Sequence, residues 1–249
     1  MNVGFLQYAP HERGLGENIR FIVNYTASLS RSLLVLPEFF LGSYTNFTLI
    51  DEEKLRLELK PLLAHSLNRN LAFIGSVPIQ AGDGGFNRSI YVNNGEVITS
   101  YDKRNLFGLE KQTLNPGAKP YPVLNFSNVK FSVQICLDNA DPIASHDAVR
   151  RHGINLLAAP ASVSVSFIRD ILKARSLENQ IVTIFCNRVG IDDGIYYSGR
   201  SSIFFPDGRE MTARSDTDLV LTSISAQDLA HQTFQRQSLF ATATATSPL

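Results

Sequence analysis

Stretches with the pattern of buried β-strands recur along the chain and alternate with stretches of helical periodicity. The strand-like stretches are rich in Val, Ile and Leu with little polar alternation, as expected of strands covered on both faces. They lie at residues 3–9, 32–38, 70–79, 88–102, 130–138, 154–162, 181–190, 201–208 and 218–225. The pair Asn94-Gly95 within one of them predicts a tight hairpin, because both residues readily adopt the backbone angles of a two-residue turn.

Helical periodicity occupies the segments between many of these strands. One helix is predicted from Glu17 to Arg31 and another from Phe167 to Gln180. The predicted buried face of the second helix consists of Phe167, Ile171, Ala174 and Leu177. A third helical region runs from Glu52 to Asn68, where Pro61 either splits the helix or opens its second part, and a fourth follows Pro142. The alternation of strand and helix predicts an α/β protein whose helices pack on sheet faces.

The composition favours one globular unit that binds a small molecule. The chain has 249 residues, with 23 basic and 23 acidic side chains and 44% hydrophobic residues, and no compositional break marks a linker. We therefore expect a single domain over residues 1–240 and a low-complexity tail at residues 241–249. Because the charge is balanced and no basic run occurs, the chain lacks the field that attracts nucleic acid or an anionic membrane.

The sequence also indicates a cytoplasmic protein with free thiols. No stretch approaches the roughly 20 apolar residues of a membrane span, and the N-terminus enters a strand-like run without a targeting segment. Cys136 and Cys186 lie in or at the end of apolar strand patterns, which favours free thiols over a disulfide. The five histidines are scattered, and the glycine-rich residues 82–85 precede a strand instead of joining a strand to a helix. We therefore expect neither a metal nor another cofactor.

Three predicted strands end in residues with reactive side chains. Glu38 follows an apolar run, Lys103 follows the predicted hairpin, and Cys136 comes where its strand pattern stops. Sites gather at strand ends in α/β folds, because the sheet holds these positions rigidly while the loops can vary. A cysteine attacks as a thiolate, so a carboxylate could take its proton. An ammonium group could stabilise the oxyanion that forms on an attacked carbonyl.

Each of these residues also has an ordinary structural interpretation. A lone cysteine in an apolar strand is most often a small core residue, which is our interpretation of Cys186. A glutamate at a strand end usually forms loop hydrogen bonds, and a lysine after a hairpin is usually solvated. Only the combination of the three side chains points to a nucleophile, a base and a cation in one site.

The motifs around these residues, taken in order, resemble the nitrilase-like carbon–nitrogen hydrolase superfamily. The matching segments are LLVLPEFF (33–40), YDKRNLFGLEKQTLNPG (101–117), FSVQICLDNADP (131–142), ARSLENQIVTIFCNRVG (174–190) and YSGRSSIFFPDG (197–208). The resemblance implies a four-layer α-β-β-α sandwich, in which two sheets lie face to face with helices outside. It also implies a homodimer or a larger homo-oligomer.

Position by position, the resemblance implies a catalytic role for four side chains. Glu38 would be the general base, Lys103 the cation that stabilises the oxyanion, and Cys136 the nucleophile. Glu110 matches the additional glutamate of the family, which holds the lysine and orients the substrate. The alternative for Glu110 is a solvated charge beside Lys111.

The resemblance also assigns supporting roles. The main-chain N–H of Leu137 would be the second oxyanion donor, and Ser162 would form part of the pocket wall. Arg175 and Glu178 match a helix beneath the site, and Asn187 matches the end of the next strand. We expect Arg175, Glu178 and Asn187 to support the structure without taking part in the chemistry.

The residues after Cys136 depart from the family pattern. The family often continues with Tyr-Asp, then an arginine and an aromatic-Pro pair, whereas residues 137–142 read LDNADP. Asp138 keeps its place but the arginine is absent, which disfavours a substrate whose carboxylate such an arginine would bind. Residues 159–164 read APASVS in place of a loop that more usually contains an aromatic residue. We therefore expect a smaller pocket wall near Ser162.

The resemblance implies an enzyme that hydrolyses a non-peptide C–N bond. A small carboxamide is the expected substrate, converted to acid and ammonia through a thioester on Cys136. In relatives the same three residues serve nitriles or N-carbamoyl compounds, and the sequence does not separate these substrates. A non-catalytic binding or regulatory protein of the same fold is the alternative from a different class.

Overall fold

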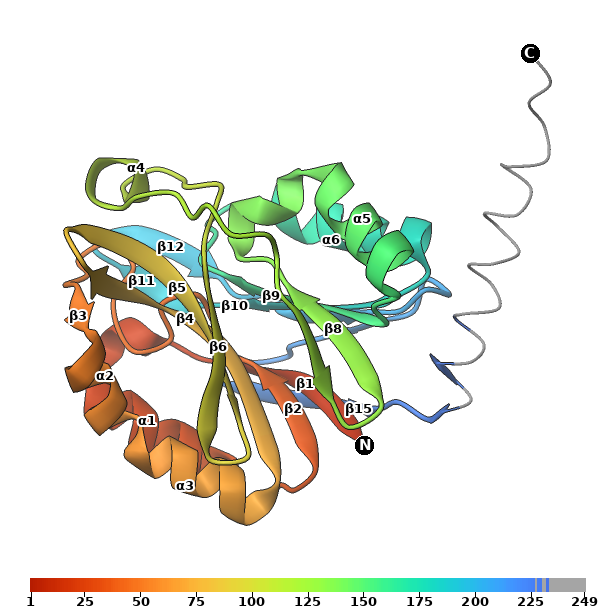
Figure 1. Cartoon of the computed structure of the whole chain (residues 1–249), viewed down its shortest axis with the longest axis horizontal. Helices are drawn as coiled ribbons and strands as arrows, with labels where there is room; N and C mark the ends of the chain where they lie inside the picture. Colours follow the sequence, from red (N-terminus) through yellow and green to blue (C-terminus); the bar gives the residue numbers. More distant parts are fainter. Residues whose placement is uncertain (227, 230–231, 233–249) are drawn as a thin grey trace.

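The computed structural model places two β-sheets face to face, with helices on the outer face of each (Figure 1). It describes residues 1–226, 228–229 and 232, so the predicted tail at residues 241–249 lies outside the described residues. The strands of the first sheet are β1 (Asn2–Gln7), β2 (Ser32–Val35), β3 (Ile50–Asp51), β4 (Leu71–Ala81), β5 (Gly84–Asn93), β6 (Glu96–Asp102) and β15 (Asp218–Ser223). Their order is β15-β1-β2-β4-β5-β6, with β3 paired to β4.

The second sheet has the order β14-β13-β10-β9-β8-β7. Its strands are β7 (Val123–Phe126), β8 (Val129–Val133), β9 (Leu156–Ala161), β10 (Val182–Asn187), β13 (Ser202–Phe204) and β14 (Glu210–Thr212). A separate hairpin joins β11 (Val189–Asp192) to β12 (Ile195–Ser198). Strands β1, β2 and β4 run parallel in the first sheet, and β8, β9 and β10 run parallel in the second. The carboxyl ends of these parallel strands therefore meet along one edge of each sheet.

Apolar side chains fill the space between the two sheets. Phe5, Val35 and Ile74 from the first sheet belong to the same buried cluster as Phe131 and Ile184 from the second. Each of these strands has apolar residues on both faces, because the other face is covered by helices. The packing of sheet on sheet therefore forms the centre of the molecule.

The helices are α1 (Leu15–Tyr25), α2 (Glu52–Glu58), α3 (Lys60–Arg69), α4 (Glu110–Thr113), α5 (Pro142–His152) and α6 (Phe167–Asn179), with 3-10 turns η1 (Pro10–Glu12) and η2 (Cys136–Ala140). Helices α1, α2 and α3 cover the outer face of the first sheet, α5 and α6 cover that of the second, and α4 lies at the end of the sheets (Figure 1). Ile22 of α1 and Leu62 of α3 pack on the first sheet, and Val149 of α5 and Leu172 of α6 pack on the second. The four-layer α-β-β-α sandwich is confirmed.

Most elements agree with the sequence analysis. Each of the nine predicted strand stretches contains a strand, and Asn94 and Gly95 form the hairpin turn with φ of +53° and +80°. Pro61 lies at the start of α3, so it opens the second part of that helical region, and α5 begins at Pro142. Four short strands of two to four residues were not predicted. They are β3, β7, β12 and β14.

Two helix predictions need correction. The first helix ends at Tyr25, six residues before the predicted end at Arg31. In α6 the predicted buried face is wrong, because Phe167 and Leu177 are exposed while Ile168 and Leu172 are buried. Both sides of α6 carry apolar residues, so periodicity alone could not identify the side that packs on the sheet. The predicted homodimer stays a prediction.

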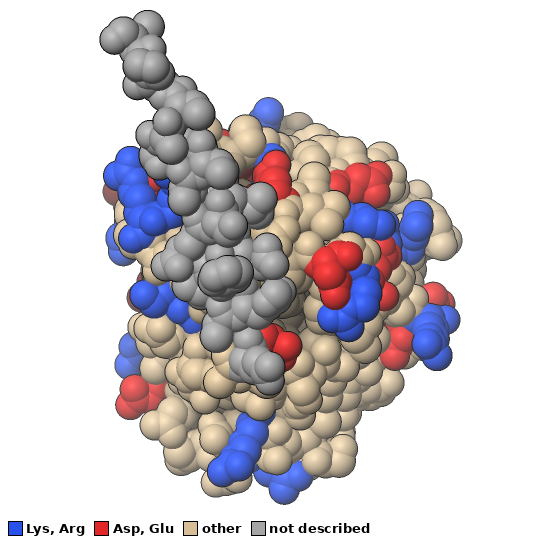
Figure 2. Space-filling model, turned by 90° about the vertical axis from the view of Figure 1, so that its right-hand side faces the viewer, with Lys and Arg blue, Asp and Glu red and all other residues tan. Residues whose placement is uncertain are grey.

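The face of the molecule shown in Figure 2 has no dominant charge. On the face shown in Figure 2, basic and acidic side chains are interspersed over a larger area of uncharged residues. Within the described part of the chain, no helix has both the length and the apolar character that crossing a bilayer requires.

Replacing Ile184 by alanine tests the contribution of the core between the sheets. Ile184 is fully buried in the cluster that joins the sheets. The Ile184→Ala variant is expected to lower the free energy of unfolding by about 2–5 kcal/mol, from lost burial and the cavity left behind. Urea denaturation followed by circular dichroism measures the loss. Leu57→Ala, on the exposed side of α2, is the control, and an equal loss in both variants would contradict the role of this core.

Candidate active site

Cys136 lies on a sharp turn at the end of β8. The strand ends at Val133, and Cys136 is the first residue of η2, where its φ is +47°. A left-handed backbone is unfavourable for a residue with a side chain, and such strain is often found at functional sites. The thiol is buried and free, as predicted.

Two side chains that follow the cysteine hold this turn in place. The amide nitrogen of Asn139 donates to the carbonyl oxygens of Gln134, at 3.0 Å, and Cys136, at 2.9 Å. The buried carboxylate of Asp138 accepts from the Ile135 N–H at 3.1 Å and from the Tyr101 hydroxyl at 2.8 Å. These hydrogen bonds stabilise the turn and thereby offset the unfavourable left-handed backbone at Cys136.

Asp138 also connects the cysteine turn to the segment that follows Lys103. Its second oxygen accepts from the main-chain N–H groups of Arg104, at 3.2 Å, and Asn105, at 2.9 Å. One aspartate therefore fixes the position of the predicted nucleophile relative to that of the predicted cation.

The three charged residues predicted for the site lie together in the interior. The ammonium group of Lys103 lies 2.7 Å from Oε1 of Glu38 and 2.6 Å from Oε2 of Glu110, and all three side chains are fully buried. Glu38 follows β2, Lys103 follows β6, and Glu110 is the first residue of α4. One ion-paired cluster thus joins the segment after β2 to the segment between β6 and α4, which lies about 65 residues later in the chain.

Asn87 is a member of this cluster that the sequence analysis missed. Its side-chain nitrogen, on β5, donates to Oε1 of Glu38 at 2.8 Å and to Oε1 of Glu110 at 2.6 Å. It thereby joins the two carboxylates that also bind Lys103. A polar residue at a buried position inside the strand pattern GGFNRSIYV was the available signal.

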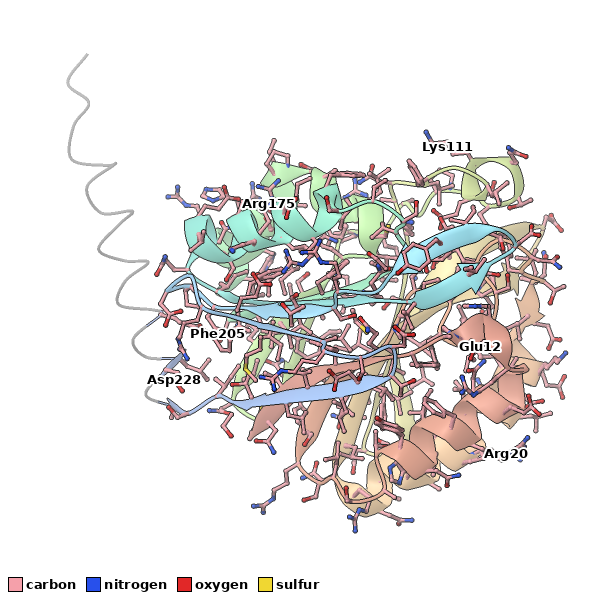
Figure 3. The ribbon with its side chains drawn as sticks, turned by 180° about the vertical axis from the view of Figure 1, so that it is seen from behind. Glu12, Arg20, Lys111, Arg175, Phe205 and Asp228 are labelled. Carbon is pink, nitrogen blue, oxygen red and sulfur yellow. The ribbon has the colours of Figure 1, made fainter. Side chains whose placement is uncertain are left out.

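The structure excludes a solvated position for Glu110. Its side chain is fully buried and also accepts from the Phe107 N–H at 2.9 Å. Lys111, the next residue, is exposed on α4 and points away from the body of the molecule (Figure 3). The two neighbours therefore have opposite environments, and Glu110 lies where the family resemblance predicts.

Burial makes Glu38 a suitable base near neutral pH. It raises the pKa of Glu38 to about 7 against the opposing charge of Lys103, and the charge of Glu110 adds to the rise. In the part of the chain that the structure describes, Oε2 of Glu38 has no hydrogen-bond partner, which leaves it available to accept a proton. The pKa of Glu38 in the folded protein lies above its usual 4.5, so protonation of Glu38 stabilises the fold. This stabilisation is fully present below pH 4.5 and is lost as the pH rises through about 7.

The thiol of Cys136 would need a base to ionise near neutral pH. Burial and the charge of Glu38 raise the pKa of Cys136 well above its usual value, and Lys103 only partly offsets them. The pKa of Lys103 is lowered by burial but raised more by Glu38, Cys136 and Glu110, so the ammonium stays charged. Cys136 is therefore a neutral thiol at rest, beside a base and a permanent cation.

Leu137 and Ser162 lie next to the thiol as predicted. Leu137 is the second residue of η2, and the first N–H groups of a helical turn have no acceptor within it. Ser162 follows β9; its main-chain N–H lies close enough to Cys136 to oppose the rise in the thiol pKa. Its hydroxyl donates to the Glu38 carbonyl oxygen at 3.0 Å, so this group holds the base in place.

Arg188 is a second residue that the sequence analysis missed. Its fully buried guanidinium donates to the Ser162 hydroxyl at 2.9 Å, to the Glu38 carbonyl at 3.0 Å and to Asp192 at 2.6 Å. It therefore ties the end of β9 and the hairpin of β11 and β12 to the segment that carries the base. The sequence signal was an arginine directly after the apolar strand IVTIFCN.

The three residues expected as structural supports form hydrogen bonds with one another or with the main chain. Arg175 donates to Glu178 at 2.7 Å on α6, the helix labelled through Arg175 in Figure 3. The side chain of Asn187 bonds both the N–H and the carbonyl oxygen of Val163, each at 2.9 Å. These contacts hold the helix and the loop that follows Ser162.

A cavity of about 180 Å³ opens onto Cys136. Its walls come from the segment before α4, the turn at Leu137, the loop after β9, the start of α6 and strand β12. Among the described residues, no group of three or more His, Cys, Asp or Glu side chains is placed to hold a metal ion. Tyr44, in the segment after β2, also lines the cavity, and like Cys136 it lies close enough to Glu38 and Glu110 to interact with them.

Comparison with known proteins identifies the family. Residues 4–232 match the profile of a family described as carbon-nitrogen hydrolase. The chain belongs to the carbon–nitrogen hydrolase family. As a family member it is an enzyme that cleaves carbon–nitrogen bonds, which sets aside a non-catalytic protein of the same fold.

Relatives of this carbon–nitrogen hydrolase include an omega-amidase and a nitrilase. It is 31% identical over 210 residues to the omega-amidase YafV of Yersinia enterocolitica, covering 79% of this chain and 80% of the relative. It is 25% identical over 204 residues to a nitrilase of Pyrococcus abyssi, covering 79% and 77%. A solved structure from Xanthomonas campestris, described as a CN-hydrolase superfamily protein with an arsenic adduct in the active site, aligns with a TM-score of 0.83. It is 22% identical, covers 100% of this chain and 98% of that chain, and has the same fold.

The raised pKa of Glu38 predicts how the reactivity of Cys136 depends on pH. Alkylation of Cys136 by iodoacetamide is expected to accelerate as the pH rises through about 7, because only ionised Glu38 accepts the thiol proton. The Glu38→Gln variant is expected to lose the inflection near pH 7, because its thiol has no such base and reacts only as it ionises by itself. The pKa of that thiol should lie below its value in the original protein, since the Glu38 charge no longer raises it. Mass spectrometry of the labelled peptide measures the rate, with the buried Cys186 as internal control. If the alkylation rate of Cys136 in the unsubstituted protein stayed constant between about pH 6 and 8, Glu38 would not be the group that accepts the thiol proton.

Proposed function

We propose that this protein hydrolyses a small carboxamide to a carboxylic acid and ammonia through a thioester on Cys136. The observation that carries the proposal is the placement of a neutral thiol beside a carboxylate with a pKa of about 7 and a buried ammonium. The omega-amidase among the relatives supports an amide as the substrate.

The first half of the proposed reaction acylates the cysteine. Glu38 takes the proton of the thiol while the sulfur of Cys136 attacks the amide carbonyl carbon. The oxyanion forms beside the Lys103 ammonium and the N–H of Leu137. Glu38 returns its proton to the amide nitrogen, the C–N bond breaks, ammonia leaves and a thioester remains on Cys136.

The second half releases the acid. Glu38 takes a proton from a water molecule, whose oxygen attacks the thioester carbonyl to give a second oxyanion beside Lys103. The C–S bond then breaks, and the sulfur recovers a proton from Glu38. Glu110 and Asn87 hold the base and the cation at constant positions through both halves, because they bond directly to Glu38 or Lys103.

The nitrile is the alternative substrate that a specific observation favours. One relative is a nitrilase, and a thiol with an adjacent base and cation could also add to a nitrile carbon. Ammonia release from matched amides, nitriles and N-carbamoyl amino acids separates the candidates. We expect amides to have a higher kcat/KM than the matching nitriles and N-carbamoyl amino acids. The cytoplasmic location and the homo-oligomer expected from the sequence stay predictions.

Removing the thiol tests the proposed intermediate. Cys136→Ala is expected to lower kcat for amides by at least about 10⁴-fold, because the attacking atom is gone. The thermal unfolding temperature should change little. Mass spectrometry of the original protein quenched during turnover should show Cys136 heavier by one acyl group.

Cys186→Ala is the matched control for this test. Cys186 lies in the core, where its sulfur contacts the Leu6 carbonyl oxygen at 3.4 Å. The control variant should retain amidase activity and the acyl adduct. Turnover by Cys136→Ala at the original rate would overturn the proposed function.

A further inference from the structure

Apolar side chains surround the mouth of the cavity. Five of them are between 40% and 53% exposed, which is unusual for residues of this type at one place. This apolar rim consists of Phe107, Leu109, Val165, Phe167 and Ile195. It comes from three segments that are distant in sequence, so it is a surface that the fold assembles.

Among the described residues, the lining of the cavity contains no charged side chain. None of the described residues that form its walls is Asp, Glu, Lys, Arg or His. The buried Lys103 is held by Glu38 and Glu110, and the buried Arg188 is held by Asp192 and main-chain oxygens. Neither cation is available to a second negative group on a substrate.

The exposed arginine that follows Lys103 does not reach the cavity. The guanidinium of Arg104 lies 5.2 Å from the centre of the Tyr121 ring. It lines a different hollow, together with Asp141 and Asp147. The arginine of the family pattern is absent from residues 137–142, so this segment supplies no cation either.

We infer that the acyl pocket selects amides with an uncharged apolar chain, whose far end rests on the apolar rim, and rejects amides that carry a carboxylate. The inference rests on the proposed function and specifies its substrate class. A carboxylate in this pocket would lose its hydration without gaining a cation. It would also be repelled by ionised Glu38 and Glu110, whose two negative charges exceed the single charge of Lys103.

Matched substrates test the inference. Pentanamide and glutaramate have five carbons each and differ in that glutaramate ends in a carboxylate. We expect kcat/KM for pentanamide to exceed that for glutaramate by at least about 100-fold. In the series from acetamide to pentanamide, kcat/KM should rise by about fourfold for each methylene that is buried. Equal values for the pair, or no rise along the series, would overturn the inference.

A cation added to the rim should change this preference. Val165 is 53% exposed in the loop before α6, so a long side chain there can reach solvent without disturbing the core. Val165→Arg is expected to raise kcat/KM for glutaramate by at least about tenfold and to lower it for pentanamide. Leu57→Arg, at an equally exposed site on α2, is the control and should change neither value. Identical behaviour of the two variants would count against the rim as the binding surface.

A second readout does not depend on hydrolysis. Iodoacetamide is neutral and iodoacetate is an anion, so the ratio of their alkylation rates at Cys136 reports the charge preference of the pocket. We expect a ratio well above that of a free cysteine peptide, and a lower ratio in Val165→Arg. If no amide released ammonia, the proposed function would fail, while this ratio would still decide whether the pocket excludes anions. A ratio equal to that of the peptide would overturn the inference by itself.

Discussion

The ammonium group of Lys103, buried between the carboxylates of Glu38 and Glu110, is the interaction on which the site depends. A charge without a partner is very unfavourable in the interior, so removing Lys103 would leave two buried carboxylates without a cation. Asn87 donates to both carboxylates and reduces their mutual repulsion. Because these contacts exist before a substrate binds, the cation needs no rearrangement when an oxyanion forms beside it.

The packing of the two sheets brings this cluster to the nucleophile. Glu38 follows β2 in the first sheet, and Cys136 follows β8 in the second, so neither sheet contains the site alone. The Glu38 N–H donates to the carbonyl oxygen of Ala161, at the end of β9, across the seam between the sheets. Arg188 bonds the Glu38 carbonyl from the second sheet. The apolar core between the sheets therefore also determines the geometry of the proposed active site.

The sequence predicted those features that have a strong local pattern. Glu38, Lys103 and Cys136 each follow a well-patterned strand, and their order matched a known family, so they could be identified together. Asn87 and Arg188 were missed because their roles come only from tertiary contacts. The buried side of α6 was predicted wrongly for a similar reason: apolar residues occur on both of its sides, and only the sheet beneath it selects one.

The raised pKa of Glu38 and the lack of a charged side chain among the described residues of the pocket lining are compatible features of the site. Burial raises the pKa of Glu38 to about 7, which places the proposed base in the range where it can both accept and return a proton. A cation fixed in the pocket would favour ionised Glu38, lower its pKa and weaken it as a base. A site that bound a carboxylate through such a cation would need another way to hold the pKa of its base. The apolar lining around Cys136 thus links the choice of substrate to the proton transfers of the reaction.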